Sequence, residues 1–134
     1  MRRSYLLDTN TASYVIKGNI PATRLRLAKI PMEQVHISSI TEAELRYGAA
    51  CRPDATKLHQ IIEEFLLRTT ILAWDSKAAQ EYGLLRASLE RAGQPIGNLD
   101  LMIAAHALAM GAILVTNDRA FARIKKLKTE NWTI

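Results

Sequence analysis

Cysteine is nearly absent from this chain, because Cys51 is the only one in 134 residues. One thiol cannot close an internal disulfide, and it argues against a cysteine-based metal site. Long apolar runs are missing too: none could span a membrane, and the run after the N-terminal arginines is too short for a signal peptide. These absences predict a soluble, cytoplasmic protein.

Repeats, low-complexity segments and interdomain linkers are also lacking, so residues 1–134 are expected to form a single domain. The 49% hydrophobic and 23% charged residues are typical of a globular chain. The formal charge of +5 and pI near 9.6 favour an anionic partner, with nucleic acid first, although many unrelated proteins are equally basic.

Short apolar runs alternate with helical patterns along the chain. Strands are predicted at 5–7, 35–37, 71–74 and 112–115, and helices at 11–17, 22–29, 42–50, 53–69, 76–92 and 98–109. This alternation predicts an α/β fold, a three-layer sandwich with a central parallel sheet of four to five strands covered by helices on both faces. Residues 129–134 could add an edge strand with Trp132 packing inward. Within 22–29, Leu25 and Ala28 are expected on one side, with Arg24, Arg26 and Lys29 among the exposed positions.

Four acids stand at positions that suggest chemistry. Asp8 and Asp118 each follow a predicted buried strand, and ligands of open α/β sheets bind at that edge. Asp8 could equally be only a helix cap. Asp100 opens the helix at 98–109, and Glu44 lies beside the apolar stripe of its own helix. If the first and fourth strands are neighbours, these acids can converge.

Carboxylates gathered in one cleft repel one another unless a cation lies among them. Mg²⁺ and Mn²⁺ prefer such oxygen ligands. Hydrogen bonds from four nearby polar residues could fix the acids in place: Thr9, Asn10, Ser39 and Thr116. His106 is expected to be a hydrogen-bonded core histidine. Five basic residues are candidates for RNA phosphate contacts, or are only a solvated face: Arg119, Arg123, Lys125, Lys126 and Lys128.

Four segments carry a resemblance to a known family: 7–10 (Leu-Asp-Thr-Asn), 38–48 with Glu44, 100–107 (Asp-Leu-Met-Ile-Ala-Ala-His-Ala) and 115–118 (Val-Thr-Asn-Asp). In order and spacing they resemble a PIN domain, and more narrowly the VapC toxins of type II toxin–antitoxin pairs. The resemblance covers nearly the whole chain. It implies a Mg²⁺- or Mn²⁺-dependent endoribonuclease with Asp8, Glu44 and Asp100 as ligands. Asp118 would be a fourth ligand or would hold a water.

The same resemblance implies partners. A cognate VapB-type antitoxin is expected to lay its carboxyl-terminal segment across the cleft, with a helix in a groove near the helices at 22–29 and 42–50. A homodimer is also expected. Related toxins cut structured RNAs such as transfer RNA, but no base-reading motif here names the target.

Two other functions are compatible with a small α/β fold. A receiver-like phosphoacceptor domain would use Asp8, an acid after the third strand (Asp75) and Thr116. That design needs an acidic pair where Thr9 and Asn10 stand, and it explains neither Glu44 nor Asp100. An RNA-binding module without catalysis would have little reason to keep four repelling acids.

Overall fold

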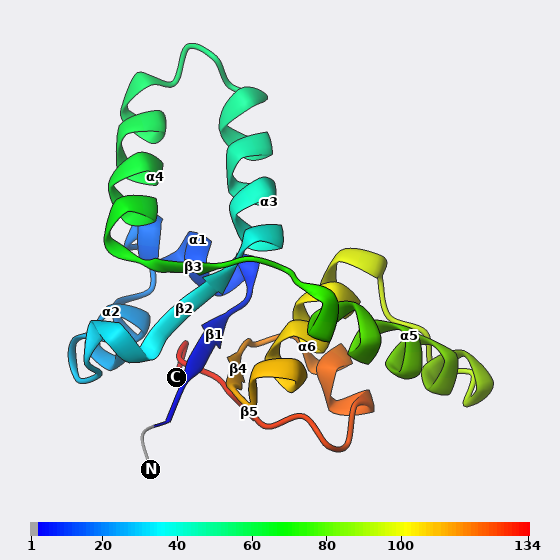
Figure 1. Cartoon of the computed structure of the whole chain (residues 1–134). Coiled ribbons are helices and arrows are strands. Elements are labelled where there is room, and N and C mark those ends of the chain that lie inside the picture. Colours follow the sequence, from blue (N-terminus) through cyan, green and yellow to red (C-terminus); the bar gives the residue numbers. More distant parts are fainter. Residues whose placement is uncertain (1–2) are drawn as a thin grey trace.

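The computed structural model describes residues 3–134, and its elements follow the predicted order (Figure 1). The strands are β1 (Tyr5–Leu7), β2 (Val35–Ser38), β3 (Thr70–Leu72), β4 (Ile113–Val115) and β5 (Thr129–Glu130). The helices are α1 (Thr9–Lys17), α2 (Pro21–Ala28), α3 (Ser39–Ala50), α4 (Thr56–Arg68), α5 (Ser76–Arg91) and α6 (Asn98–Met110). Two 3₁₀ turns are added, η1 (Met32–Gln34) and η2 (Arg119–Arg123).

The five strands form one parallel sheet in the order β3-β2-β1-β4-β5. β1 and β4 are direct neighbours, with Leu7 in register with Val115. Parallel strands all end at the same edge, so the residues that follow β1 and β4 lie side by side there. The first and fourth strands are therefore neighbours, as convergence of the acids requires.

Helices cover both faces of the sheet, which explains why the strands read as apolar without alternation. Tyr5 and Leu7 of β1 pack in a cluster with residues of α1, α3 and α4. Leu6, between them, packs in a second cluster with residues of α5 and α6. Successive strand residues point to opposite faces, so one strand serves both cores.

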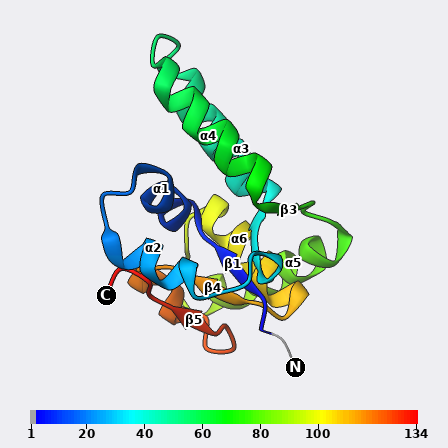
Figure 2. The ribbon, with the colours of Figure 1, turned by 90° about the vertical axis from the view of Figure 1, so that its left-hand side faces the viewer.

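The α3–α4 hairpin projects from the sheet as a long arm (Figures 1 and 2). Leu45 and Ala49 of α3 and Ile62 of α4 are buried between the helices and the core. Arg46 adds ion pairs on the hairpin surface, at 2.9 Å to Glu42 and 2.6 Å to Glu63. Exposed pairs of this kind contribute little, so the apolar stripe holds the arm together.

One local prediction needs correction. In α2, Leu25 is 65% exposed, and the fully buried residue is Thr23, whose hydroxyl donates to the Ile20 carbonyl at 2.7 Å. An eight-residue helix gives too few positions to fix its buried side from periodicity, and a satisfied hydroxyl can take the inner place. The basic segment after β4 contains one short 3₁₀ turn, η2.

The predicted edge strand at the C-terminus is confirmed. Trp132 is 1% exposed and stacks against Tyr5 at 5.4 Å between ring centroids. Its indole N–H donates to Glu130 Oε1 at 3.0 Å, and Arg26 of α2 pairs with the same oxygen at 3.0 Å. These contacts fasten the last residues to β1 and α2.

Candidate active site

Asp8 lies at the end of β1 and caps α1. Its Oδ1 accepts the Thr11 N–H at 2.8 Å, and its own N–H donates to the Val115 carbonyl at 3.0 Å. The side chain is only 3% exposed. The capping role and the functional role considered from the sequence are thus compatible, because the cap uses one carboxylate oxygen.

The surroundings of Asp8 disfavour its ionised form. Burial raises the pKa of Asp8, and the negative charge of Asp118 raises it further. Hydrogen bonds from Thr116 and Thr11 act in the opposite direction. The effect of burial exceeds that of the hydrogen bonds, so the ionised form of this carboxylate carries a free-energy cost.

Glu44 is tied to the start of α1 through a short hydrogen bond. Thr9 Oγ1 donates to Glu44 Oε1 at 2.6 Å, and the same hydroxyl lies 3.2 Å from Thr41 Oγ1. Thr41 and Glu44 are three residues apart on α3 and therefore face the same side of that helix. A carboxylate that leans toward the interior is costly without a partner, and Thr9 is the partner of Glu44.

Asp100 lies in the first turn of α6 and is half-buried. Burial is the largest cause that raises the pKa of Asp100, followed by the negative charges of Asp118, Asp8 and Glu44. These interactions require all four predicted acids to lie near one another, so the structure brings them to one edge of the sheet.

Asp118 stands at the rim of this group and is exposed. Its N–H donates to Thr116 Oγ1 at 3.0 Å, and its Oδ1 accepts the Ala120 N–H at 2.9 Å, which caps the turn η2. Beside it, the Asn117 amide lies 3.4 Å from the Tyr14 hydroxyl of α1. Asp118 is therefore the most accessible of the four acids.

The predicted supporting residues divide evenly. Thr9 and Thr116 hydrogen-bond to acids, whereas Ser39 Oγ accepts the Trp74 N–H at 3.1 Å, and exposed Asn10 makes no bond to an acid within residues 3–134. Sequence reasoning missed Thr11, whose backbone N–H donates to Asp8 and whose hydroxyl donates to the Val115 carbonyl at 3.1 Å. Its place three residues after a capping aspartate was the available signal.

The four acids supply only oxygen ligands, the kind that hard divalent cations prefer. Within residues 3–134, no group of three or more His, Cys, Asp or Glu side chains is arranged so that it could hold a metal ion. Asp8, Glu44 and Asp118 each give one oxygen to a hydrogen bond inside the protein. The donor chemistry fits a divalent cation, and the acids lie at the rim and wall of one site.

Four of the five basic residues predicted to contact RNA fall into two groups, and the fifth, Lys128, lines a hollow at the opposite edge of the sheet. Arg123 donates to a loop carbonyl before α6 at 2.6 Å, and Lys126 pairs with an acid of α5 at 3.5 Å. Arg119 and Lys125 are exposed and make no ion pair within residues 3–134. Arg119 directly follows Asp118, so its side chain starts at the rim of the acid group.

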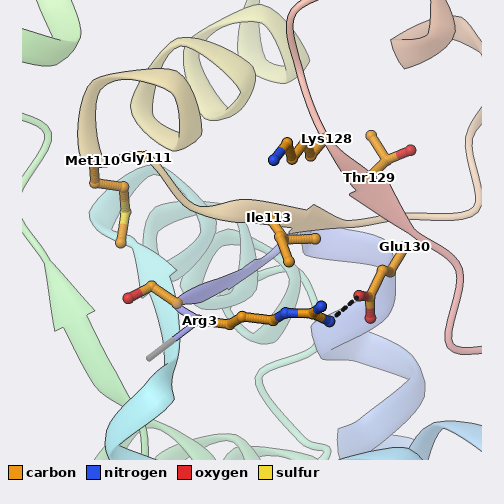
Figure 3. Close-up of a pocket in the computed structure, with 8 residues that line it drawn as sticks. Arg3, Met110, Gly111, Ile113, Lys128, Thr129 and Glu130 are labelled. Atoms are coloured by element: carbon orange, nitrogen blue, oxygen red, sulfur yellow. Dashed lines mark ion pairs between the residues drawn. The ribbon is translucent and has the colours of Figure 1, made fainter. Parts of the chain in front are cut away.

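Two hollows are lined by none of the four acids. One, of about 780 Å³, is at the opposite edge of the sheet, where Ser4 precedes β1 and Ile113 begins β4. Figure 3 shows Arg3 and Glu130 paired across it. The other, of about 370 Å³, is largely apolar and lies between α1, α2 and α4. The hollow borders α2, as expected of a groove there, but α1 and α4 rather than α3 form the rest of it, because the apolar stripe of α3 is already buried.

The sheet order argues against the receiver-like alternative. β3 is an edge strand and β2 separates it from β1, so Asp75 does not follow a neighbour of β1. Asp75 Oδ1 accepts the Ala78 N–H at 3.1 Å and caps α5, which accounts for this acid without a phosphoacceptor role. Within residues 3–134, no helix has the length and apolar character needed to cross a membrane.

Comparison with known proteins gives one consistent answer. The PIN domain profile matches residues 5–127. The chain is 43% identical to Ribonuclease VapC2 of Haemophilus influenzae over 129 residues, which is 96% of this chain and 97% of that protein. It is 40% identical to the tRNA(fMet)-specific endonuclease VapC of Shigella flexneri over 130 residues, or 96% and 98% of the two chains.

Solved structures agree in fold. DNA-bound VapBC from Salmonella typhimurium contains a chain that superposes with a TM-score of 0.91 at 38% identity, covering 98% of this chain and 99% of that one. For VapBC2 of Rickettsia felis, bound to a promoter fragment, the TM-score is 0.88 at 38% identity, with 96% and 98% covered.

Proposed function

This chain belongs to the PIN domain family, and on that premise we propose that it is an endoribonuclease acting as the toxin of a toxin–antitoxin pair. The observation that carries the proposal is the meeting of Asp8, Glu44, Asp100 and Asp118 at the carboxyl edge of β1 and β4. Hydrolysis of a phosphodiester needs negative charge to be balanced as water attacks, and a cation held by two of these carboxylates would do so.

The proposed cofactor is Mg²⁺ or Mn²⁺. Mg²⁺ is usually held by one or two carboxylates and keeps several waters, so two of these acids are enough to bind it. Asp8 and Asp100 are the first candidates, because the pKa of each is raised by burial and by neighbouring negative charge. A bound cation would reverse that penalty and supply an activated water and charge stabilisation at the phosphate. Glu44, oriented by Thr9, and Asp118 would complete the site.

The chain's own residues prepare this edge for an RNA phosphate. Thr9 hydrogen-bonds to one oxygen of Glu44, and Thr11 to one oxygen of Asp8. Because both threonines belong to α1, that helix fixes the orientation of the two carboxylates and of their remaining oxygens. Arg119 offers an exposed guanidinium next to Asp118, and Arg side chains bind phosphate through paired N–H groups. Arg123 and Lys126 are already engaged within the protein, so we expect smaller contributions from them.

The proposed substrate is RNA, with initiator transfer RNA as the first to test. Two relatives that match over nearly their whole length are named tRNA(fMet)-specific endonucleases. The acids lie at an edge rather than in a deep pocket, since Asp118 is exposed and Asp100 only half-buried. An open site of this kind admits a folded RNA, whose backbone and shape would be read more than its helical bases.

The proposed partner is an antitoxin that places an apolar helix in the hollow between α1, α2 and α4. Its lining includes Ile16, Leu27, Ile61 and Phe65. Solved relatives include toxin–antitoxin complexes of Salmonella typhimurium and Rickettsia felis, each with a chain like this one. The hollow borders α1, which also carries Thr9 and follows Asp8, so a partner seated there lies close to the acids.

The test is cleavage of bacterial RNA and of initiator transfer RNA by purified protein. Wild type and Asp8→Asn would each be assayed with Mg²⁺, with Mn²⁺ and with chelator. We expect discrete fragments that require a metal and disappear with Asp8→Asn. Asp54→Asn, at an exposed turn between α3 and α4, is the matched control and should cut like wild type. Equal inertness of wild type and Asp8→Asn under every condition would refute the proposal.

A further inference from the structure

His106 is a buried titratable residue that the proposed site does not use. It lies on α6, is 4% exposed, and its Nδ1 is 2.9 Å from Ser38 Oγ. The contact joins residues 68 positions apart in the chain and is itself buried. It therefore connects two elements that carry different acids of the site: α6 carries Asp100, and Ser38 leads into α3, which carries Glu44.

Ser38 can serve both elements at once. It is the last residue of β2 and the cap of α3, where its Oγ accepts the Ile40 N–H at 3.1 Å. The hydroxyl hydrogen is then available to donate to Nδ1 of a neutral His106 ring. Burial lowers the pKa of His106 and so favours that neutral form, although the charge of Asp75 opposes the decrease. Every polar group in the contact is satisfied in one arrangement.

A second link joins the same two helices. Ser39 Oγ accepts the backbone N–H of Trp74 at 3.1 Å, and the Trp74 indole donates to the Met102 carbonyl at 2.9 Å. Met102 is two residues after Asp100. The start of α3 is thus held against α6 at two places, through Ser38 and through Ser39.

The His106–Ser38 contact lies far enough from the acids that a small rotation of the helices there moves the acids appreciably. Glu44 lies six residues beyond Ser38 and Asp100 six residues before His106, a distance of about 9 Å along each helix. A change of about 10° in the angle between the helices would move an acid by roughly 1.5 Å at that distance. Displacements of about 1 Å are enough to impair a site built on fixed geometry.

We propose that His106 is a positioning residue, which through Ser38 sets the separation of Glu44 and Asp100 and thereby the affinity of the site for a divalent cation. This inference rests on the proposed function. His106 itself touches neither substrate nor metal. Residues that hydrogen-bond directly to metal ligands typically change metal affinity by about 10–100-fold when they are removed, and because His106 acts one step further out, through Ser38, we expect the lower end of that range.

The test measures Mg²⁺ binding without catalysis, as the Mg²⁺ concentration that gives half of the maximal rise in melting temperature. His106→Leu fills the space but cannot accept the hydrogen bond from the Ser38 hydroxyl. We expect the midpoint Mg²⁺ concentration of this variant to rise about tenfold or more. His106→Asn presents an amide near the position of Nδ1 and should restore the midpoint to within about threefold. Ile103→Val, a buried change on the same helix, is the control for general loosening and should keep the wild-type midpoint.

If His106→Leu does not fold, Ser38→Ala removes the same hydrogen bond from the other side and should give the same increase. A wild-type midpoint in His106→Leu or Ser38→Ala would overturn the inference while leaving the proposed function intact. An equal increase in Ile103→Val would also overturn it, because the effect would then be unspecific. A wild type that neither responds to Mg²⁺ nor cuts RNA would defeat the proposed function, and this inference with it.

Discussion

Replacing Asp8 by Asn should make the folded chain more stable while abolishing RNA cleavage. Asn caps helices as well as Asp does, so the bond from the Thr11 N–H to Oδ1 is kept. What disappears is a negative charge that is buried and repelled by Asp118. The hydrogen bonds from Thr11 and Thr116 become weaker without that charge and cancel part of the gain. We expect a net increase of about 0.5–2 kcal/mol in the free energy of unfolding at pH 7 without divalent cations.

The pH dependence of this gain follows from the sign of the pKa shift. The pKa of Asp8 is raised above the ordinary value of 3.8, so between those two values the folded chain binds more protons than the unfolded chain. Wild-type stability therefore falls as pH rises through that interval, and the loss persists above it. Asn does not titrate. The difference between Asp8→Asn and wild type should thus be largest at neutral pH and close as the pH falls toward 4.

Thermal unfolding followed by circular dichroism at pH 4, 5, 6 and 7, with chelator present, measures this difference. For a chain of this size the expected gain is about 2–8 °C in melting temperature at pH 7. Asp54→Asn makes the same chemical change at an exposed turn and should shift the melting temperature by little at any pH. Added Mg²⁺ should stabilise wild type more than Asp8→Asn. The reasoning is refuted if Asp8→Asn melts below wild type at pH 7, or if the gap is the same at pH 4 and pH 7.

Three further changes test other parts of the structure. Thr9→Val removes the hydroxyl that donates to Glu44 at 2.6 Å. The rate of RNA cleavage should fall by about 10–100-fold with little change in melting temperature. Thr9→Ser keeps the hydroxyl and should cut RNA at nearly the wild-type rate. Glu130→Ala leaves the indole N–H of buried Trp132 without its partner and should cost about 1–2 kcal/mol in urea unfolding; no loss would mean that the C-terminal contacts are not stabilising. Arg119→Ala should weaken RNA binding and lower the slope of log affinity against log salt by about 1, and an unchanged slope would remove Arg119 from the interface.

The sequence predicts the frame of this protein well because β1 and β4 are short, apolar and followed by polar residues. Asp8 and Asp118 could be placed at one edge from that pattern alone, and Glu44 stood out because it leans toward the apolar side of α3. What the pattern does not contain is contact between distant elements. The bond from Thr9 to Glu44 spans 35 positions, and no local rule links those residues.

The remaining errors have local causes. Leu25 is exposed although it is apolar, because α2 is only eight residues long and a hydrogen-bonded threonine occupies its inner side. The apolar hollow forms beside α1, α2 and α4, a combination that depends on how α3 and α4 pair. Periodicity gives the face of each helix separately, whereas a groove is set by which helices become neighbours.

The distribution of polar groups in the core gives a physical reason to regard the acid group as functional. Within residues 3–134, every buried side-chain nitrogen or oxygen has a hydrogen-bond partner. At one edge the same chain nevertheless keeps Asp8 and Asp100 where burial and mutual repulsion raise their pKa values. A single amide substitution would lower the free-energy cost of this repulsion. The chain instead carries the negative charges on four separate segments, at a position where a bound cation would remove the cost.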